Sequence, residues 1–344
     1  MDKYIITEEY SVRSAIEKMT SENIKAVVVV KNDIITGLFS NGDMRKYFLA
    51  GGELSECIVN AMNRKPKLYH SLTEIEEERK TIHRVIYPVV DADNKLIKVV
   101  DYENNDNMVN TSLENVPLVI MAGGKGTRLY PYTKILPKAL MPIGELTITE
   151  RIIDSFRKYG CKSVHMILNH KAGMIKSYMS DLKKDYEITF YEEEKFLGTG
   201  GGLKLIAKDI KDTFILSNCD ILIKDDLECI YKTHKMKNNK ITFVCSMKNV
   251  VIPYGVIEAD SDGSIKKMKE KPDFSFLVNT GVYVVEPDVL DEINSGEFIH
   301  MPDLAQRLID KGENVGVFPI PEESWLDMGQ FNAMQDMLRK LDIE

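Results

Sequence analysis

The chain contains the run Val119-Ile120-Met121-Ala122-Gly123-Gly124-Lys125-Gly126-Thr127-Arg128-Leu129, followed shortly by Pro137-Lys138. The apolar, β-branched part predicts a strand, and three glycines within four positions predict a sharply turning loop after it. Because glycine has no Cβ, the backbone N–H groups of such a loop can approach a polyphosphate closely. Arg128 and Lys138 add fixed positive charge. The stretch therefore predicts a strand and loop that bind a nucleoside triphosphate.

Two other phosphate-binding loops do not fit this stretch. The dinucleotide pattern G-x-G-x-x-G needs a third glycine where this chain has Leu129. The P-loop pattern needs Ser or Thr directly after its lysine, and Gly126 follows Lys125 here. For the loop taken alone, a glycine-rich turn without a ligand is the alternative interpretation.

A longer match decides between these interpretations. Residues 123–144 read GGKGTRLYPYTKILPKALMPIG and resemble the opening signature of the sugar-1-phosphate nucleotidyltransferases, G-G-x-G-T-R-L-x-P-x-T followed by P-K. Further fragments of that family follow in order, from residue 117 to the end of the chain: LGTGGGL at 197–203, LSNCD at 216–220, EKP at 270–272, NTGVYVVEP at 279–287 and WLDMG at 325–329. The resemblance implies an α/β fold, Rossmann-like and GT-A-like, with a doubly wound, mostly parallel sheet and a small β lid.

The hydrophobic patterns of this part agree with alternating strands and helices. The strands are expected at 163–168, 188–191, 214–217 and 241–245, and the helices at 148–159, 174–182, 203–207 and 227–234. Short β-like runs at 254–258, 265–268 and 282–285 predict a small lid for the sugar, and a helix at 331–338 closes the chain.

The family's reaction joins a nucleoside triphosphate to a sugar 1-phosphate, and the resemblance implies Mg²⁺ as cofactor. Asp220 follows the apolar run 214–219, so it can project over the carboxyl edge of the sheet. With the distant Asp327, it matches the family's metal ligands, and carboxylates suit Mg²⁺. Cys219 stands where the family usually has glycine. As alternatives, Asp220 can be a turn residue and Asp327 the N-cap of the last helix.

The resemblance also assigns the residues around both substrates. Arg128 would contact the triphosphate, Lys138 would bridge phosphates, and Lys271 would hold the sugar phosphate. The other residues expected at the nucleotide are Ala122, Gly123, Gly124, Gly126, Thr127, Asn169, Gly198, Thr199 and Gly200. The other residues expected at the sugar are Tyr254, Gly255, Glu270 and Asn279. Glu270 could equally pair with a lysine across a strand ladder.

The base is the hardest part of the substrate to infer. The glycines at 197–202 would admit a base edge to backbone groups, and Gly200 replaces the alanine of many relatives. The segment 193–199, together with the N-terminal module described below, looks most like guanylyltransferases that make GDP-sugars. We therefore expect GTP, while UTP, dTTP and CTP stay open.

The N-terminal part contains two weakly similar units, at 4–60 and 67–102. In the first, residues at helical spacing follow Ser11, a plausible N-cap, and strands are expected at 26–30 and 34–40. The segment GLFSNGDMRKYF and the following AMNRKP resemble a CBS motif. A second, shortened copy would have a helix at 72–83 and strands at 84–90 and 96–101. A polar, asparagine-rich linker at 103–112 separates residues 1–112 from a nucleotidyltransferase domain at 113–344.

The CBS resemblance implies a possible regulatory ligand. In CBS pairs the cleft often holds an adenine nucleotide, with an aspartate at the position of Asp43 on the ribose and Ser40 near the phosphate. The alternative is that Asp43 caps the helix that begins after Gly42.

Composition excludes several classes of function. The net charge of −8 offers no basic stripe for nucleic acid. No apolar run of membrane length occurs, and the first ten residues are too charged for a secretory signal, so we expect a cytoplasmic protein. We also expect a homo-oligomer. The five cysteines lack metal-site spacing. A different class, a catalytically silent nucleotide sensor, would have little use for both Asp220 and Asp327.

Overall fold

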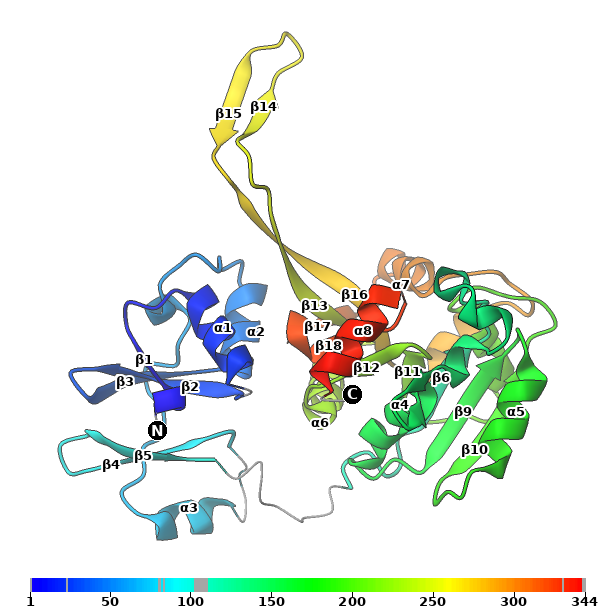
Figure 1. The fold of residues 1–344 in the computed structure, drawn as a ribbon, viewed down its shortest axis with the longest axis horizontal. Helices are drawn as coiled ribbons and strands as arrows, with labels where there is room; N and C mark the ends of the chain where they lie inside the picture. Colours follow the sequence, from blue (N-terminus) through cyan, green and yellow to red (C-terminus); the bar gives the residue numbers. More distant parts are fainter. Residues whose placement is uncertain are drawn as a thin grey trace. The chain divides into compact units, whose positions relative to one another are not determined.

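The structure is a computed structural model that describes residues 2–22, 24–79, 82, 84–101, 111–329 and 331–341 (Figure 1). The chain divides into two compact units. Unit 1 comprises Met1–Met108 and Asn249–Ser275, and unit 2 comprises Val109–Lys248 and Phe276–Glu344. Most of the predicted linker at 103–112 lies outside the described residues. The segment 249–275 groups with unit 1, although the family resemblance spans it.

Unit 2 is built on a seven-stranded sheet with the strand order β10-β9-β6-β11-β16-β13-β17 (Figure 1). The neighbours from β10 to β11 are parallel, β16 is antiparallel to β11, and β13 is parallel to β17. The predicted α/β fold with a doubly wound, mostly parallel sheet is confirmed. The strands are β6 (Leu118–Ala122), β9 (Ser163–Leu168), β10 (Glu187–Glu192), β11 (Phe214–Asn218), β13 (Ile241–Val251), β16 (Asp273–Val285) and β17 (Val315–Pro321).

Helices and short strands complete unit 2. The helices are α4 (Ile148–Arg157), α5 (Ala172–Asp181), α6 (Leu227–Lys237), α7 (Met301–Asp310) and α8 (Phe331–Lys340). The short strand pairs are β7 (Pro142–Ile143) with β8 (Leu146–Thr147), and β12 (Ile221–Ile223) with β18 (Trp325–Asp327). At the start of α4, Thr147 and Glu150 form a capping box, which satisfies two backbone N–H groups of the first turn.

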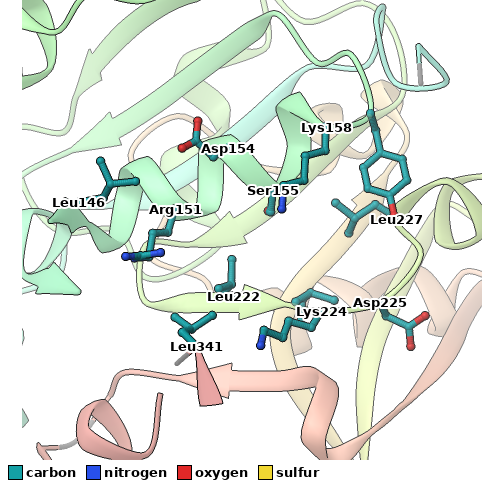
Figure 2. Close-up of a pocket in the computed structure, with 12 residues that line it drawn as sticks. Leu146, Arg151, Asp154, Ser155, Lys158, Leu222, Lys224, Asp225, Leu227 and Leu341 are labelled. Atoms are coloured by element: carbon teal, nitrogen blue, oxygen red, sulfur yellow. The ribbon is translucent and has the colours of Figure 1, made fainter. Parts of the chain in front are cut away.

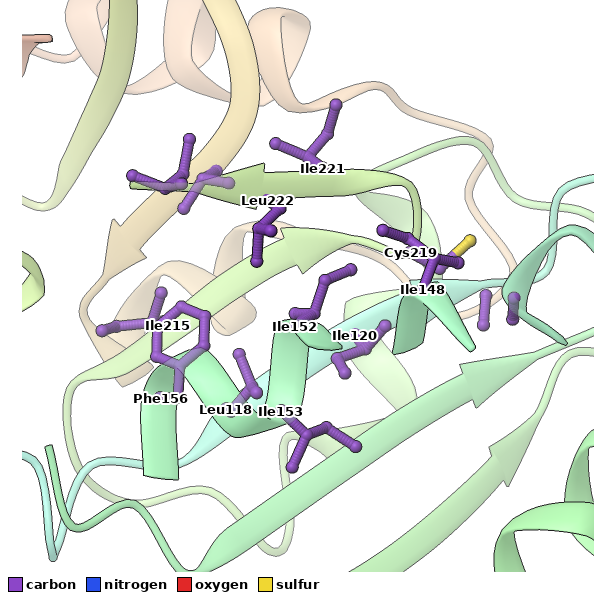
Figure 3. Packing of buried hydrophobic residues seen from close by; sticks show 14 of the residues in the cluster. Leu118, Ile120, Ile148, Ile152, Ile153, Phe156, Ile215, Cys219, Ile221 and Leu222 are labelled. Atoms are coloured by element: carbon purple, nitrogen blue, oxygen red, sulfur yellow. The ribbon is translucent and has the colours of Figure 1, made fainter. Parts of the chain in front are cut away.

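Two hydrophobic cores cover the two faces of the sheet, and β6 contributes to both. Its side chains alternate, so Leu118 and Ile120 join one core while Val119 and Met121 join the other. In the first core, Leu118 and Ile120 lie with Ile152 and other side chains of α4 (Figure 3). Because β6 is buried on both faces, its sequence is a continuous apolar run rather than an alternating one. The buried strand gives the glycine loop a rigid base.

The structure corrects two expectations about elements of unit 2 and adds two elements that were not expected. The run 282–285 belongs to β16 inside the main sheet, not to a lid, because it pairs with β11. The expected helix at 203–207 is a 3₁₀ turn at Gly201–Ile206. Helix α7 and strand β17 were not predicted at all. The runs at 254–258 and 265–268 do form a separate two-stranded hairpin, β14 (Val256–Ala259) with β15 (Ile265–Lys269).

Helices and strands of unit 1 lie in both segments that were expected to form repeats. The first has β1 (Ile5–Thr7), α1 (Val12–Ser21), β2 (Ala26–Lys31), β3 (Ile34–Ser40) and α2 (Asn41–Leu49), with the sheet order β1-β2-β3. The second has α3 (Leu72–Arg79), β4 (Tyr87–Val90) and β5 (Leu96–Val100). Ser11 is the N-cap of α1, as predicted, and its side chain accepts from the backbone N–H of Ser14 at 3.1 Å. Among the described residues, no helix has the length and apolarity needed to cross a bilayer.

Candidate active site

The glycine loop after β6 turns at Gly126, whose φ of +64° lies in the left-handed region that favours glycine. A Cβ on Gly126 would lie 2.9 Å from Thr133 Cγ2 and 3.1 Å from Lys138 Cβ. The Thr133 hydroxyl donates to the Gly126 carbonyl at 2.9 Å. A Cβ on Gly124, by contrast, would meet nothing within 4 Å. Gly126 therefore serves the turn itself, whereas the loop is open at Gly124.

Lys171 holds this loop from the segment that follows β9. Its ammonium group donates at 2.8–2.9 Å to the carbonyl oxygens of Thr133, Lys134 and Ile135. These carbonyls lie at the end of a short 3₁₀ turn, where partial negative charge suits a cation. Lys171 thus fixes the position of the chain between Arg128 and Lys138.

The ribbon of β12 and β18 brings two acidic residues together. The strands are antiparallel, and Ile221 lies opposite Asp327. Asp220 directly precedes β12, and its carbonyl accepts from the backbone N–H of Met328 at 2.9 Å. Asp220 and Asp327, which are far apart in sequence, are therefore neighbours at the carboxyl edge of the sheet. Asp327 lies in β18 rather than at the N-cap of α8.

Two predicted cations flank this acidic pair. Lys138 Nζ and Asp220 Oδ2 form an ion pair, and both side chains are largely buried. A Cβ on Gly329 would lie 2.8 Å from Asp327 Oδ1 and 3.2 Å from Arg128 Nη2, so both groups approach this glycine. The structure thus gathers Arg128, Lys138, Asp220 and Asp327, which we call the charged cluster.

The electrostatics of the charged cluster fit a divalent cation. Burial raises the pKa of Asp327, and the negative charge of Asp220 raises it further. The backbone N–H of Gly329 donates to Asp327 Oδ1 at 2.6 Å and acts in the opposite direction. Within the described ranges, no group of three or more His, Cys, Asp and Glu gathers for a metal. Two carboxylates suffice for Mg²⁺, which usually keeps waters and phosphate oxygens as its other ligands.

A cavity of about 540 Å³ adjoins the charged cluster. Three members of the charged cluster line it: Arg128, Asp220 and Asp327. The other lining residues are Thr199, Asn218, Asn279, Thr280, Gly281, Tyr283, His300 and Asp303, together with the apolar Ile221, Pro302 and Trp325. Asn279 donates to the Tyr283 hydroxyl at 2.9 Å and accepts from the Gly281 N–H at 3.0 Å, so its orientation is fixed. The cavity thus combines charged, polar and apolar side chains.

A buried carboxylate, Glu193, lies between the two glycine-rich loops and is only 4% exposed. A Cβ on Gly123 would lie 2.8 Å from its Oε2, and a Cβ on Gly202 would lie 2.6 Å from its Oε1. Oε1 accepts weakly from the Leu197 N–H at 3.3 Å, whereas Oε2 accepts from no described residue. Burial raises the pKa of Glu193. We call this carboxyl group and the glycines around it the Glu193 site.

The second glycine-rich loop packs against the segment before α7. The N–H groups of Gly200 and Gly201 donate to the Ile299 carbonyl at 3.0 and 3.2 Å. A Cβ on Gly198 would lie 2.5 Å from that same oxygen, and one on Gly201 would lie 2.1 Å from the Glu297 carbonyl. These glycines therefore permit a close approach of two backbone segments. From the sequence they were expected at the base, and this packing role was not predicted.

Asn169, which was expected at the nucleotide, joins the two loops. Its side-chain amide donates to the Glu193 carbonyl at 2.9 Å. A Cβ on Gly123 would lie 3.1 Å from Asn169 Cβ. Asn169 thus lies beside the glycine loop, with its amide group already engaged in holding the backbone of Glu193.

Four residues expected at the sugar lie in unit 1, on the segment that contains β14 and β15. There the turn at Tyr254 and Gly255 approaches Glu270, because a Cβ on Gly255 would lie 3.0 Å from Glu270 Oε2. Lys271 has φ +42°, a left-handed conformation that a lysine adopts only under strain. Their roles at the sugar stay predictions, as does that of Asn279, which lines the cavity of unit 2.

The expected CBS ligand residues contact each other. Ser40 is the N-cap of α2, and both its N–H and its hydroxyl donate to Asp43 Oδ2, at 3.0 and 2.6 Å. The helix starts at Asn41, not after Gly42, so Asp43 caps it from the third position of a capping box. Ligand binding at Ser40 and Asp43 stays a prediction.

A second cavity of unit 2, about 340 Å³, contains none of the expected site residues. Leu146, Leu222 and Leu341 line it together with side chains of α4 (Figure 2). Its cations are partly engaged, because Arg151 donates to the Ile143 carbonyl and Lys224 to the Lys340 carbonyl, both at 2.6 Å. The cavity beside the charged cluster is therefore the candidate site.

Comparison with protein families bears directly on this site. A family model described as "Nucleotidyl transferase" matches residues 118–343, and one described as "CBS domain" matches residues 1–50. The first match spans the glycine loop, both acidic residues of the charged cluster and the Glu193 site. The chain belongs to the nucleotidyl transferase family. It also has a CBS domain at its N-terminus.

Relatives of this nucleotidyl transferase have several named activities. A UTP–glucose-1-phosphate uridylyltransferase of Synechocystis sp. is 32% identical over 232 residues, which is 62% of this chain and 60% of the relative. A mannose-1-phosphate guanyltransferase of Pichia angusta is 32% identical over 227 residues, with the same shares. A D-glycero-alpha-D-manno-heptose 1-phosphate guanylyltransferase of Campylobacter jejuni is 29% identical over 190 residues, which is 55% of this chain and 84% of the relative. The chain thus spans about 60% of the first two relatives.

Solved structures share the fold. A putative glucose-1-phosphate thymidylyltransferase from Bacillus anthracis, in complex with a sucrose, matches with a TM-score of 0.53 and 21% identity, covering 67% of this chain and 96% of its own. HddC from Yersinia pseudotuberculosis, complexed with GMP-PN, matches with a TM-score of 0.51 and 21% identity, covering 66% and 99%. At this identity the matches support the fold of the nucleotidyl transferase domain alone.

Three residues at the nucleotidyl transferase site were not predicted. Glu193 had a weak signal, since a run of three glutamates precedes the LGTGGG segment, but its burial depends on the approach of Gly123 and Gly202. Lys171 and His300 had none, because each acts on a loop that is distant in sequence. Their contacts became visible only in the folded chain.

Proposed function

We propose that this chain transfers the nucleotidyl group of a nucleoside triphosphate, with GTP preferred, to a sugar 1-phosphate. The products are an NDP-sugar and pyrophosphate, and the reaction depends on Mg²⁺. Two findings support the proposal: the charged cluster beside a cavity, and relatives whose names specify transfer to glucose, mannose or heptose 1-phosphate. The alternative is a nucleotide sensor without catalysis.

The reaction needs positive charge more than it needs a protein nucleophile. An oxygen of the sugar phosphate attacks the α-phosphorus in line, and the bond from that phosphorus to the bridging oxygen of pyrophosphate breaks. Lys138 and Arg128 would neutralise charge as both anions approach and as pyrophosphate leaves. Asp220 and Asp327 would hold Mg²⁺, which when bound supplies Lewis-acid stabilisation of phosphate oxygens. In the free protein, Lys138 is paired with Asp220.

The preference for GTP is supported by a single observation, a buried carboxylate at the Glu193 site, one oxygen of which accepts from no described residue. Guanine presents two adjacent donors, N1–H and the N2 amino group, which match the two oxygens of one carboxylate. Glu193 Oε2 accepts from no described residue, and the carboxyl group lies so close to the backbone of Gly123 and Gly202 that a Cβ there would come within 2.8 and 2.6 Å of its oxygens. A carboxylate in a dry site gains most from a ligand that supplies N–H groups.

The other bases match this site less well. Uracil and thymine present one N–H between two carbonyl oxygens, so a carboxylate would gain one hydrogen bond and face a repelling oxygen. Adenine and cytosine present one amino group beside a ring nitrogen that accepts. Only guanine satisfies both oxygens of Glu193 with donors.

We also propose roles for the remaining residues that the family resemblance singled out. The backbone at Ala122, Gly123, Gly124, Gly126 and Thr127 would bind phosphates, and Asn169, Gly198, Thr199 and Gly200 would border the base. Tyr254, Gly255, Glu270, Lys271 and Asn279 would contact the sugar phosphate. The strained φ of Lys271 is consistent with a functional position, because such strain persists where function requires it.

Pyrophosphate release tests the reaction. Purified protein is incubated with Mg²⁺, one of five triphosphates (GTP, UTP, dTTP, CTP or ATP), and mannose, glucose or heptose 1-phosphate. We expect release with GTP and at least one sugar, and none when Mg²⁺ is removed with EDTA. If no pair gave pyrophosphate, the chain would be a sensor rather than an enzyme.

The base assignment has its own test in the variant Glu193→Gln. Glutamine offers one acceptor and one donor, which suits the edge of uracil or thymine better than that of guanine. We expect kcat/KM for GTP to fall by about 10- to 100-fold, because hydrogen bonds to a charged acceptor are lost. The ratio of UTP to GTP use should rise. Glu194→Gln, at the exposed neighbouring position, is the matched control and should leave the ratio unchanged.

A regulatory role for the CBS unit is a separate proposal. An adenine nucleotide bound near Ser40 and Asp43 would adjust the activity of the enzyme. Titration calorimetry of the full chain with AMP and ATP tests this, with Asp43→Ala as the variant that should weaken binding. If neither nucleotide gave heat, the CBS unit would serve packing or assembly instead.

A further inference from the structure

The ring of His300 is held in one orientation at the edge of the cavity beside the charged cluster. The backbone N–H of Thr199 lies 3.3 Å from His300 Nδ1, and the Thr199 hydroxyl lies 3.4 Å from the same atom. The Thr199 hydroxyl also accepts from the Met301 N–H at 3.1 Å. The ring packs edge-on against Phe298, with 5.1 Å between centroids. His300 is thus fixed by contacts on both sides of its ring.

These contacts determine which nitrogen of His300 carries the proton. A backbone N–H can only donate, so Nδ1 must accept from Thr199 and cannot itself be protonated. The Thr199 hydroxyl must then also donate to Nδ1, since that nitrogen has no hydrogen to offer. The single ring proton of the neutral imidazole therefore resides on Nε2.

The Nε2–H group has no acceptor among the described residues, while His300 lines the cavity. The neighbouring lining residues Asn279 and Asp303 supply an amide and a carboxylate. Neutral donors and an acidic acceptor suit hydroxyl groups, which both accept and donate. They do not suit phosphates, which the carboxylate of Asp303 would repel, nor the guanine edge, which the proposed function assigns to Glu193, a residue outside the lining of this cavity.

We propose that His300 is a specificity-determining residue, whose Nε2–H donates a hydrogen bond to a hydroxyl oxygen of the sugar 1-phosphate. This inference rests on the proposed function and names one contact within it. The hydrogen bonds of Gly200 and Gly201 to Ile299 fix the backbone next to His300, so the donor is held in place before the sugar arrives. Such preorganisation lets one N–H distinguish sugars that differ at a single hydroxyl.

Two substitutions separate this role from a purely structural one. His300→Asn keeps an acceptor oxygen close to the place of Nδ1, so the contact with Thr199 survives, but it removes the donor at the place of Nε2. His300→Gln does the reverse, because its longer side chain reaches the place of Nε2 with an amide N–H. Asp310→Asn, at an exposed position of α7, is the control for the helix.

The measurements are steady-state KM and kcat with GTP and the sugar 1-phosphate that the enzyme uses best, together with its monodeoxy analogues. We expect His300→Asn to raise KM for the sugar phosphate by roughly 3- to 10-fold, the usual effect of one neutral hydrogen bond. KM for GTP should stay within about twofold of the native value on the same grounds. His300→Gln should lie closer to the native enzyme in KM for the sugar phosphate.

The deoxy analogues identify the contact itself. In the native enzyme, one analogue should lose the same factor that His300→Asn loses, and in His300→Asn that analogue should show no further loss. Thermal unfolding of each variant shows whether it is folded.

Three results would overturn the proposal. If His300→Gln raised KM for the sugar phosphate more than His300→Asn did, the ring would act only through Thr199. If the change fell on KM for GTP, the contact would be to the ribose and not to the sugar phosphate. If the native enzyme released no pyrophosphate with any pair of substrates, both this inference and the proposed function would fail, which distinguishes the two cases.

Discussion

Among the described residues, a buried carboxylate is paired with a cation in the charged cluster but not in the Glu193 site. In the charged cluster, the carboxylate of Asp220 faces Lys138, and Arg128 lies near Asp327. In the Glu193 site, one carboxylate is 4% exposed and one of its oxygens accepts from no described residue. The comparison indicates two tasks. The cluster balances charge before any substrate arrives, whereas the Glu193 site keeps an unfavourable burial that a ligand with N–H donors would relieve.

The largest expected effect comes from the charged cluster. Asp220→Asn removes one of two carboxylates and leaves Lys138 without its partner, so charge is no longer balanced where phosphates meet. We expect kcat to fall by about 10²- to 10³-fold, the size of effect that follows loss of one electrostatic contributor. Asp291→Asn, with a side chain 85% exposed, is the control and should retain native kcat. A kcat within threefold of native for Asp220→Asn would remove the cluster from the mechanism.

Alanine substitutions at two glycines, one in each glycine-rich loop, test how tightly the backbone of each loop is packed. A Cβ on Gly201 would lie 2.1 Å from the Glu297 carbonyl, whereas one on Gly124 would meet nothing within 4 Å. We expect Gly201→Ala to lower the free energy of unfolding by about 2–3 kcal/mol, because two backbone segments must move apart. Gly124→Ala should be within about 0.5 kcal/mol of native, as for open positions. Equal losses in urea denaturation of the two variants would contradict this account.

Substitution of Lys171 should have an intermediate effect, because Lys171 holds the chain between Arg128 and Lys138. Lys171→Met keeps the apolar stem but removes three donors, leaving the carbonyls of Thr133, Lys134 and Ile135 unpaired. We expect a loss of about 2 kcal/mol in the free energy of unfolding, in the range for charged hydrogen bonds. Lys176→Met is the control, since Lys176 pairs with Glu192 at the surface. If both variants lost the same stability, Lys171 would not act as a clamp.

The sequence was most informative where chemistry and local pattern coincide. The strand and loop at 118–126 could be predicted because an apolar run leads into glycines, and Asp220 could be placed because it follows such a run. The relation of Asp220 to Asp327 depends on the β12–β18 ribbon, whose three-residue strands have too little pattern to be recognised. The pairing of Asp220 with Asp327 was therefore predicted from the family resemblance and not from the local sequence pattern.

The Glu193 site shows why the rest could not be predicted. Nothing in the local sequence distinguishes Glu193, which is buried, from Glu194, which is exposed. The difference arises from the approach of Gly123 and Gly202, which belong to separate loops. Likewise, 282–285 looks like a short lid strand in isolation, but β16 extends through it into the sheet. Long-range packing decided both outcomes.

The smallest expected effect is on stability, and it comes from the Glu193 site. Burial raises the pKa of Glu193 above its ordinary value of 4.5, so the unfolded chain loses this proton at lower pH than the folded chain does. The native protein therefore loses stability as pH rises from that value through the folded pKa, and carries the full cost above it. Glu193→Gln cannot ionise and should escape this loss. Near neutral pH we expect it to be more stable by about 1 kcal/mol, the size of a relieved unpaired polar group.

Unfolding of native protein, Glu193→Gln and Glu194→Gln in urea at a series of pH values from below the ordinary carboxyl pKa of 4.5 up to neutrality measures this difference. The gain of Glu193→Gln over native should grow with pH, while Glu194→Gln, at an exposed position, should follow the native curve. A gain in stability together with a loss of GTP use would mean that the carboxylate is kept for recognition at a cost to the fold. A constant difference at all pH values would instead show that Glu193 is not the buried, ionising group that the comparison with the charged cluster requires.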